Sequence, residues 1–133
     1  MSKNRVFWAE ALDSTNDSVA AVVAAGTSGG ASLHSTAALA GTATTIKASA
    51  GNLYHIDMVN QDAAARFLQI FDAASPTVGT TTPDYVIELA ASETLHLDFG
   101  TPLTFATAIV VAFTTTAGGA TGATATQFSA AYK

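Results

Sequence analysis

The sequence predicts an all-β protein built as an antiparallel β-sandwich, of either the jelly-roll or the immunoglobulin-like kind. Short apolar runs separated by turn residues recur at nearly even intervals between residues 52 and 116. Within several of these runs apolar and polar side chains alternate, which is the period of a β-strand. No connection after residue 44 has room for a crossover helix, so the strands must be antiparallel. Two packed sheets are favoured over a closed barrel, and the spacing leaves both kinds of sandwich open.

The composition suits one domain that sits in an assembly. A chain of 133 residues is long enough for a single core. It has no cysteine, which excludes disulfides and thiolate metal sites. Only 11% of its residues are charged, against about 25% in typical soluble domains. A surface with few charges is expected where neighbouring subunits cover much of it.

Charge and hydropathy exclude several classes of partner. The formal net charge of −5 would repel a phosphate backbone, so no nucleic acid is expected as a partner. No apolar run approaches the ~20 residues that span a bilayer, so no membrane contact is expected. The first ten residues lack the apolar core of a secretory signal. We expect a soluble protein that is made in the cytoplasm.

Residues 1–43 lack a steady period of two and are predicted to form an irregular N-terminal arm, with residues 44–133 as the sandwich domain. Inside the arm, residues 17–25 allow a short capped helix and equally a valine-rich strand. The arm has little order of its own or becomes ordered on a partner. Aromatic and arginine side chains are common interface anchors. The candidate interface residues are therefore Lys3, Arg5, Phe7 and Trp8.

The first strands of the domain are predicted at residues 44–49 and 52–60, joined by an Ala-Gly turn. In the second strand Tyr54, Ile56 and Met58 share one face. A short polar connection leads from it into residues 63–72, which predicts a hairpin. That third strand has apolar side chains on both faces, so both faces are expected to be covered.

Prolines and glycines divide the rest of the chain. Pro76, Gly79 and Pro83 predict a long loop over residues 75–83. Strands follow at residues 84–89 and 94–99, and the Gly-Thr-Pro sequence at 100–102 is predicted to end the second of them. Residues 105–116 carry large side chains on one face and small ones on the other, which indicates a buried central strand. A glycine-rich loop over residues 117–125 precedes a last strand at 127–133.

The alternation predicts that ten apolar side chains from these strands supply most of one core. They are Tyr54, Ile56, Leu68, Ile70, Ile87, Leu95, Leu97, Ile109, Val111 and Phe113.

Two histidine and aspartate pairs are the chemically active groups that stand out. His55 with Asp57, and His96 with Asp98, each lie at i and i+2, roughly 6.5–7 Å apart on one side of a strand. A solvated sheet face accounts for them better than a metal or acid/base site. The histidines, including His34, have no second ligand at short helical spacing, and no phosphate-loop or nucleophile-elbow motif is present. We expect neither an enzyme nor a bound cofactor.

Several segments resemble small structural proteins of tailed bacteriophages. The resemblance is carried by Gly51-Asn-Leu-Tyr, by Ala63-Ala-Ala-Arg-Phe-Leu with Asp72, by Pro76-Thr-Val-Gly-Thr80, by Ala106-Thr-Ala-Ile-Val110 and by the final Tyr-Lys. It covers roughly residues 44 to 133. The resemblance implies a β-sandwich that decorates or cements the capsid shell, or that sits on head or tail fibres.

This resemblance favours a capsid decoration or cement protein of the virion, which would bridge copies of the major capsid protein. Such a protein is expected to self-associate as a trimer or dimer, matching the symmetry axes of an icosahedral shell. The alternative is a fibre or tail-associated module that binds a receptor or carbohydrate. In that case the loops at 73–83 and 117–126 would carry the contacts, although neither contains an aromatic residue.

Overall fold

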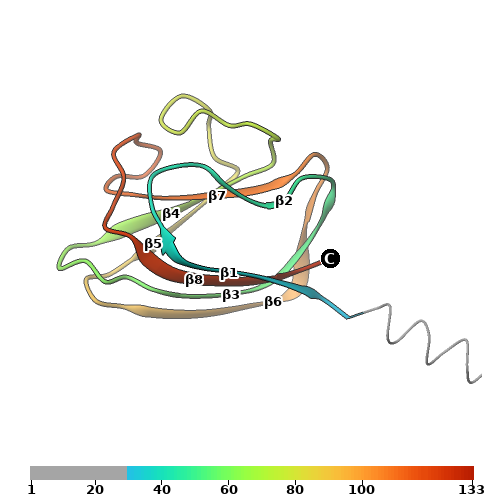
Figure 1. Cartoon of the computed structure of the whole chain (residues 1–133), viewed down its shortest axis with the longest axis horizontal. Coiled ribbons are helices and arrows are strands. Elements are labelled where there is room, and N and C mark those ends of the chain that lie inside the picture. The colour runs from blue at the N-terminus through green and yellow to red at the C-terminus, as the bar shows by residue number, and fades with distance from the viewer. Residues whose placement is uncertain (1–29) are drawn as a thin grey trace, which may run out of the picture. The chain divides into compact units, whose positions relative to one another are not determined.

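The structure, a computed structural model, describes residues 30–133 and shows two antiparallel sheets packed face to face (Figure 1). The predicted all-β sandwich is therefore confirmed. Within these residues there are eight strands: β1 (Ser32–Leu39), β2 (Thr44–Lys47), β3 (Gly51–Val59), β4 (Arg66–Phe71), β5 (Tyr85–Leu89), β6 (Thr94–Phe105), β7 (Ile109–Thr114) and β8 (Thr126–Tyr132).

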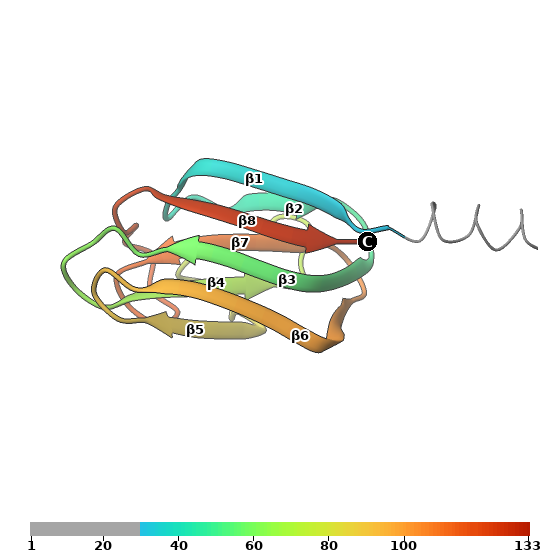
Figure 2. The same cartoon turned by 90° about the horizontal axis from the view of Figure 1, so that it is seen from below.

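The strand order decides which kind of sandwich this is. Sheet A has the order β1-β8-β3-β6, and sheet B has the order β2-β7-β4-β5 (Figure 2). The first strand thus pairs with the last, the second with the seventh, the third with the sixth and the fourth with the fifth. The chain is one long antiparallel ribbon that is rolled up, so that β3 also meets β8 and β4 meets β7. This is a jelly roll, and it differs from the A-B-E-D and C-F-G sheets of the immunoglobulin fold.

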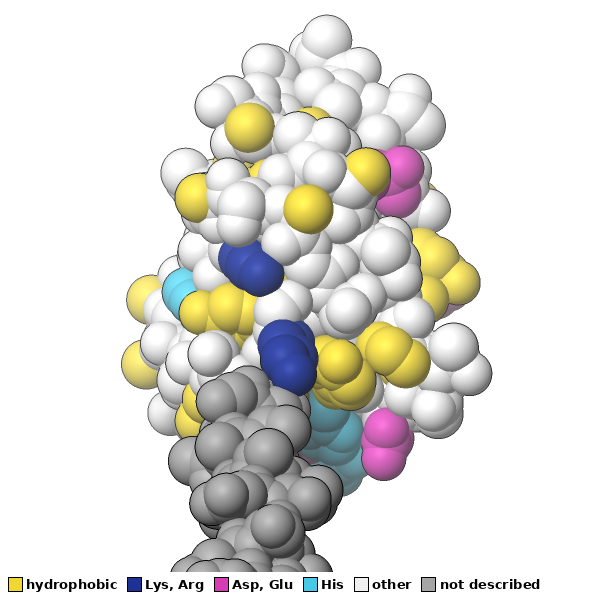
Figure 3. All heavy atoms as spheres, turned by 90° about the vertical axis from the view of Figure 1, so that its right-hand side faces the viewer, with side chains coloured by type: hydrophobic (Ala, Val, Ile, Leu, Met, Phe, Trp, Pro, Cys, Tyr) yellow, Lys and Arg dark blue, Asp and Glu magenta, His cyan; other side chains and the backbone are white. Residues whose placement is uncertain are grey.

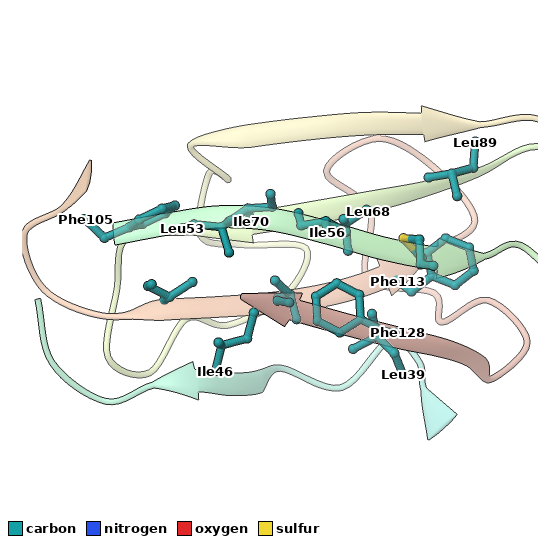
Figure 4. Packing of buried hydrophobic residues seen from close by; sticks show 14 residues of the cluster. Leu39, Ile46, Leu53, Ile56, Leu68, Ile70, Leu89, Phe105, Phe113 and Phe128 are labelled. Atoms are coloured by element: carbon teal, nitrogen blue, oxygen red, sulfur yellow. The ribbon is translucent and has the colours of Figure 1, made fainter. Parts of the chain in front are cut away.

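The core lies between the sheets and takes side chains from all eight strands (Figure 4). Six of the ten predicted core residues are buried there, and Ile87, Leu95 and Leu97 pack against its margin. The buried cluster consists of Leu39, Ile46, Leu53, Ile56, Met58, Leu68, Ile70, Leu89, Phe105, Ile109, Val111, Phe113, Phe128 and Ala130.

A second, smaller cluster covers the outer face of sheet B. Phe71, Val110 and Ala112 are buried on this face, and Ala73 and Val78 from the connection after β4 pack against them. Figure 1 shows that connection looping over sheet B. Every residue of β7 is buried as a result. The predicted central strand and the predicted cover on both faces of residues 63–72 are thereby confirmed.

The sandwich begins earlier in the chain than we predicted. β1 lies within the range assigned to the arm, yet it pairs with β8 from Ser32 to Leu39. It is an edge strand rich in small residues, and Leu39 is its one fully buried side chain. Such a strand does not show the alternation that marks a strand with one buried face. The helix or strand expected at residues 17–25 lies outside the described residues.

The predicted hairpin between residues 52–60 and 63–72 is wrong, because β3 belongs to sheet A and β4 to sheet B. The connection crosses from one sheet to the other and is held by the buried Asn60. Its side-chain amide donates to the carbonyls of Ala64, Leu89 and Ala90, and its Oδ1 accepts from the backbone N–H of Asp62. A short polar connection in the sequence fits such a crossing as well as it fits a hairpin.

A bulge in the pairing of β3 with β6 explains two further differences between the structure and the sequence predictions. The β3–β6 register jumps between Leu53 and His55 on β3, and between Leu103 and Asp98 on β6. The bulge interrupts the alternation of β3 between Leu53 and Ile56, which are both buried although they are three residues apart. Leu53 is therefore in the core, while Tyr54 is only partly buried. Gly100 and Pro102 lie in the bulged part of β6. They bend this strand, as such residues do at bulges, and do not end it.

Deleting residues 1–43 should destabilise the sandwich, because it removes β1, the partner of β8, together with the buried Leu39. The assignment of residues 1–43 to an arm outside the sandwich implies the opposite, that this truncation folds. Deleting only residues 1–30 should preserve the melting temperature, since all eight strands of the described part remain. Thermal unfolding followed by circular dichroism compares the two chains. Equal melting temperatures would contradict the structural role of β1.

Replacing Ile109 by Asp should unfold the domain. Ile109 is fully buried in the core, and an isolated buried carboxylate costs several kcal/mol out of a typical stability of about 5–15 kcal/mol. Leu33→Asp is the matched control, because Leu33 is 72% exposed on β1. It should change the free energy of unfolding by less than about 0.5 kcal/mol in chemical denaturation. A folded Ile109→Asp variant would show that this register is wrong.

Candidate functional site

The outer face of sheet A carries a cluster of histidine and aspartate side chains. His55 and Asp57 come from β3, and His96 and Asp98 come from β6, on alternate positions of each strand. The antiparallel register places His55 opposite Asp98 and Asp57 opposite His96. Each imidazole thus has an aspartate beside it on its own strand and another on the neighbouring strand. We call this set the histidine-aspartate cluster.

Asp57 is the centre of the cluster. Its Oδ2 lies 2.7 Å from Nε2 of His55, and its Oδ1 accepts a hydrogen bond from Nδ1 of His96. The hydrogen bond from His96 is the main cause that lowers the pKa of Asp57, and His55 acts in the same direction against partial desolvation. When the imidazoles are protonated, these contacts are ion pairs at the surface, with the Asp57 side chain 39% exposed.

A depression lies over all four strands of sheet A, and Asp57 and His96 of the cluster form part of its wall. Its volume is about 180 Å³, which is smaller than the ~300–1,000 Å³ of typical small-molecule sites. The residues around it are Ser35, Thr36, Ala37, Asp57, Met58, Val59, Thr94, His96, Gln127, Phe128 and Ser129.

The cluster alternates imidazole and carboxylate groups along and across two strands. In residues 30–133 no three His, Asp or Glu side chains are arranged to hold a metal ion. Both imidazoles hydrogen-bond to the Asp57 carboxylate. Alternating hydrogen-bonding and charged groups at a surface give a partner a defined register and orientation through electrostatic complementarity.

Other acids of the sandwich are hydrogen-bonded within it. The Asp72 carboxylate accepts the backbone N–H groups of Ala106 and Thr107 at 2.8 and 2.7 Å, and that of Ala108 at 3.2 Å. These bonds lower its pKa despite some desolvation. Asp62 accepts from Arg66 at 2.8 Å, and the same bond is the main cause that lowers its pKa. Sequence reasoning missed both roles, because their partners are fixed by the turns of the folded chain.

The structure describes some of the predicted site residues and not others. Lys3, Arg5, Phe7 and Trp8 lie outside the described residues. The structure confirms that His55 and Asp57 are neighbours on an outward face, and it adds the contact from His96, which the sequence does not reveal without the register. His34 lies on β1 opposite Ala130 and does not join the cluster.

Comparison with protein-family models, with curated proteins and with solved structures finds no match for this chain. Among residues 30–133 there is no helix of the length and apolar character needed to cross a membrane.

Replacing Asp57 by Asn should destabilise the protein at neutral pH and have less effect in acid. The pKa of Asp57 is lowered below its ordinary value of 3.8 in the folded state. The stability from its charged form is therefore present above 3.8 and is lost as the pH falls through the folded-state pKa. Denaturation of both proteins at several pH values measures the difference. A difference that stays constant into acid would contradict the ionic role of Asp57.

Proposed function

We propose that this chain is a virion structural protein of a bacteriophage, a capsid decoration or cement protein that bridges copies of the major capsid protein. The sequence resemblance supports the viral source. The jelly roll is compatible with this role, since it occurs in viral capsid domains as well as in lectins. Because one fold serves many functions, the surface of the molecule carries the greater weight.

The observation that carries the proposal is the shortage of free charge on the sandwich. The chain has few charged residues, and several of its acids accept hydrogen bonds from within the domain, among them Asp62, Asp72, Asp84 and Glu93. Figure 3 shows one face on which uncharged and apolar groups predominate. Leu33, Tyr85 and Val86 are also exposed. Such a surface favours permanent contact with neighbours over solvation.

A protein of this kind acts through contact area. Each copy that bridges shell subunits adds interface that internal pressure must break, and lasting contacts of this sort bury on the order of 2,000 Å² or more. The proposed role needs neither catalysis nor a cofactor, nucleic acid or membrane. The protein is made in the host cytoplasm and resides on the capsid surface. It self-associates as a trimer or dimer at the symmetry axes of the shell.

We assign the shell contact to the arm. Phe7 and Trp8 stand beside Lys3 and Arg5 in the sequence, and burying each large aromatic side chain contributes roughly 1.5–3 kcal/mol. Aromatic and arginine residues dominate interface energetics. The sandwich then remains outside the shell as a rigid body that reaches neighbouring subunits.

A fibre or tail-associated binding module is the second candidate, and one observation favours it. The loops at 73–83 and 117–126 lie together, because a Cβ on Gly79 would be only 2.4 Å from the Cβ of Ala120. Loops that cluster on a rigid sandwich are a common place for receptor or carbohydrate binding. The number of copies per particle separates the two candidates, since hundreds indicate the shell and a few indicate the tail.

The full-length protein should co-sediment with capsids that lack it, and Phe7→Ala combined with Trp8→Ala should weaken this binding strongly. Truncating two hot-spot aromatics costs about 2 kcal/mol or more each, equivalent to at least roughly a thousandfold loss in affinity together. Thr101→Ala is the control and should leave binding unchanged, because Thr101 is an exposed polar residue of the sandwich. Equal binding by the arm variant and the wild type would refute the assignment to the arm. Absence of wild-type binding would refute the capsid proposal itself.

A further inference from the structure

One edge of sheet A is open along β6. In residues 30–133, β6 pairs only with β3 and ends the order β1-β8-β3-β6. Its first half, residues 94–99, has no lysine or proline, and the bend with Gly100 and Pro102 comes only after it. Natural proteins protect exposed strand edges with such residues, with bulges or with covering segments. An unprotected edge offers a row of backbone N–H and C=O groups to another strand.

The sequence of this edge is complementary to itself. It reads Thr94-Leu-His-Leu-Asp-Phe99. If two copies pair antiparallel around a twofold axis at Leu97, His96 of each copy faces Asp98 of the other on the outer side. On the inner side, Leu95 of each copy faces Phe99 of the other. Both rows are then matched, because residues opposite each other in an antiparallel pair lie on the same face.

The molecule already contains this pairing once. β3 presents His55-Ile56-Asp57 to β6, with His55 opposite Asp98, Ile56 opposite Leu97 and Asp57 opposite His96. β6 itself carries the same order of types, His96-Leu97-Asp98. On one edge, β6 pairs with the histidine, apolar and aspartate order of β3. A second copy of β6 would present the same order to the other edge, which is free in the described residues. Histidine and aspartate would alternate across four adjacent strands.

The apolar side chains beside this edge would gain cover from the same contact. Leu95, Leu97 and Phe99 are only partly buried and pack at the margin of the core. Figure 2 places β5 on the same flank as β6, and β5 carries two of the exposed large apolar residues, Tyr85 (48%) and Val86 (40%). Edge-to-edge association would shield part of this apolar flank from water.

We infer that two copies of this chain associate through their β6 edges, in antiparallel register about Leu97, to form one continuous sheet across the dimer. The histidine-aspartate cluster sets the register of this contact, and the backbone groups of β6 supply its hydrogen bonds. The inference concerns the sandwich alone. It would hold whether the dimer decorates a capsid or serves another assembly.

Single cysteines test the register in the full chain, which has none of its own. Around the proposed axis the two Cα atoms at position 97 lie about 4.5–5.5 Å apart, within the ~4.4–6.8 Å range of a disulfide. Leu97→Cys should therefore form a covalent dimer under mild oxidation. Leu95→Cys is the matched control on the same face, because its two copies would be roughly 13 Å apart. Equal cross-linking of both variants, or none by Leu97→Cys, would overturn the inference.

Analytical ultracentrifugation of the full chain tests the charge pairing. The wild type should dimerise at micromolar concentration, and Asp98→Lys should weaken dimerisation by about tenfold or more, since the change removes the carboxylate that would face each His96 and brings a cation beside that imidazole. Leu33→Lys, at the other edge of sheet A on β1, should leave dimerisation unchanged. A monomeric wild type, or equal effects of both lysines, would contradict the proposal. If Asp98→Lys fails to fold by circular dichroism, the cysteine pair decides.

Discussion

The architecture depends on the antiparallel pairing of the two halves of the chain. β1 to β4 form one half of a ribbon and β5 to β8 the other, so that each strand meets a partner counted from the opposite end. Rolling this ribbon creates the two sheets and the core between them. The ends of the chain's described part therefore stabilise one another, since Ser32 pairs with Tyr132. Contacts this distant in sequence also make folding slow relative to helical proteins.

Two polar side chains fix the places where the ribbon turns. Asn60 ties the crossing between β3 and β4 to the end of β5 through the carbonyls of Leu89 and Ala90. Asp72 ties the end of β4 to the β6–β7 turn through three backbone amides. Both side chains bond to backbone groups in the connections, where the regular sheet ladder does not continue, and polar backbone groups buried without a partner are costly. Polar residues at the turns thus stabilise the connections between the strands, as apolar residues stabilise the core.

Sequence reasoning recovered the local structure of the sandwich better than its long-range pairing. β3 and β5 were predicted within a residue or two, because their alternation or apolar runs reflect their own burial. β1 was missed because an edge strand of small residues has no such pattern. Tyr54 was placed in the core because the bulge that buries Leu53 instead depends on the partner strand. The contact between Asp57 and His96 was missed for the same reason, since 39 residues separate them.

The two outer faces of the sandwich differ, and this difference limits where a partner can bind. Loops cover sheet B and bury Phe71 and Gln69 beneath them, whereas no loop within residues 30–133 buries the outer face of sheet A in the same way. On sheet A the charged groups are concentrated on β3 and β6. Within sheet A, this row therefore carries the electrostatic specificity that a partner could recognise.

That row also selects one register for a strand that docks on β6. Moving the twofold axis from Leu97 to position 96 would place His96 opposite its own copy. Moving it to position 98 would place Asp98 opposite its own copy, and like charges directly opposite each other are destabilising. An axis between two residues would set an outward side chain against an inward one, because side chains alternate with a period of two. Of these axes, the one at Leu97 pairs histidine with aspartate on the outer side and apolar with apolar side chains on the inner side. The side chains of β6 therefore limit which register an added strand can adopt on its open edge.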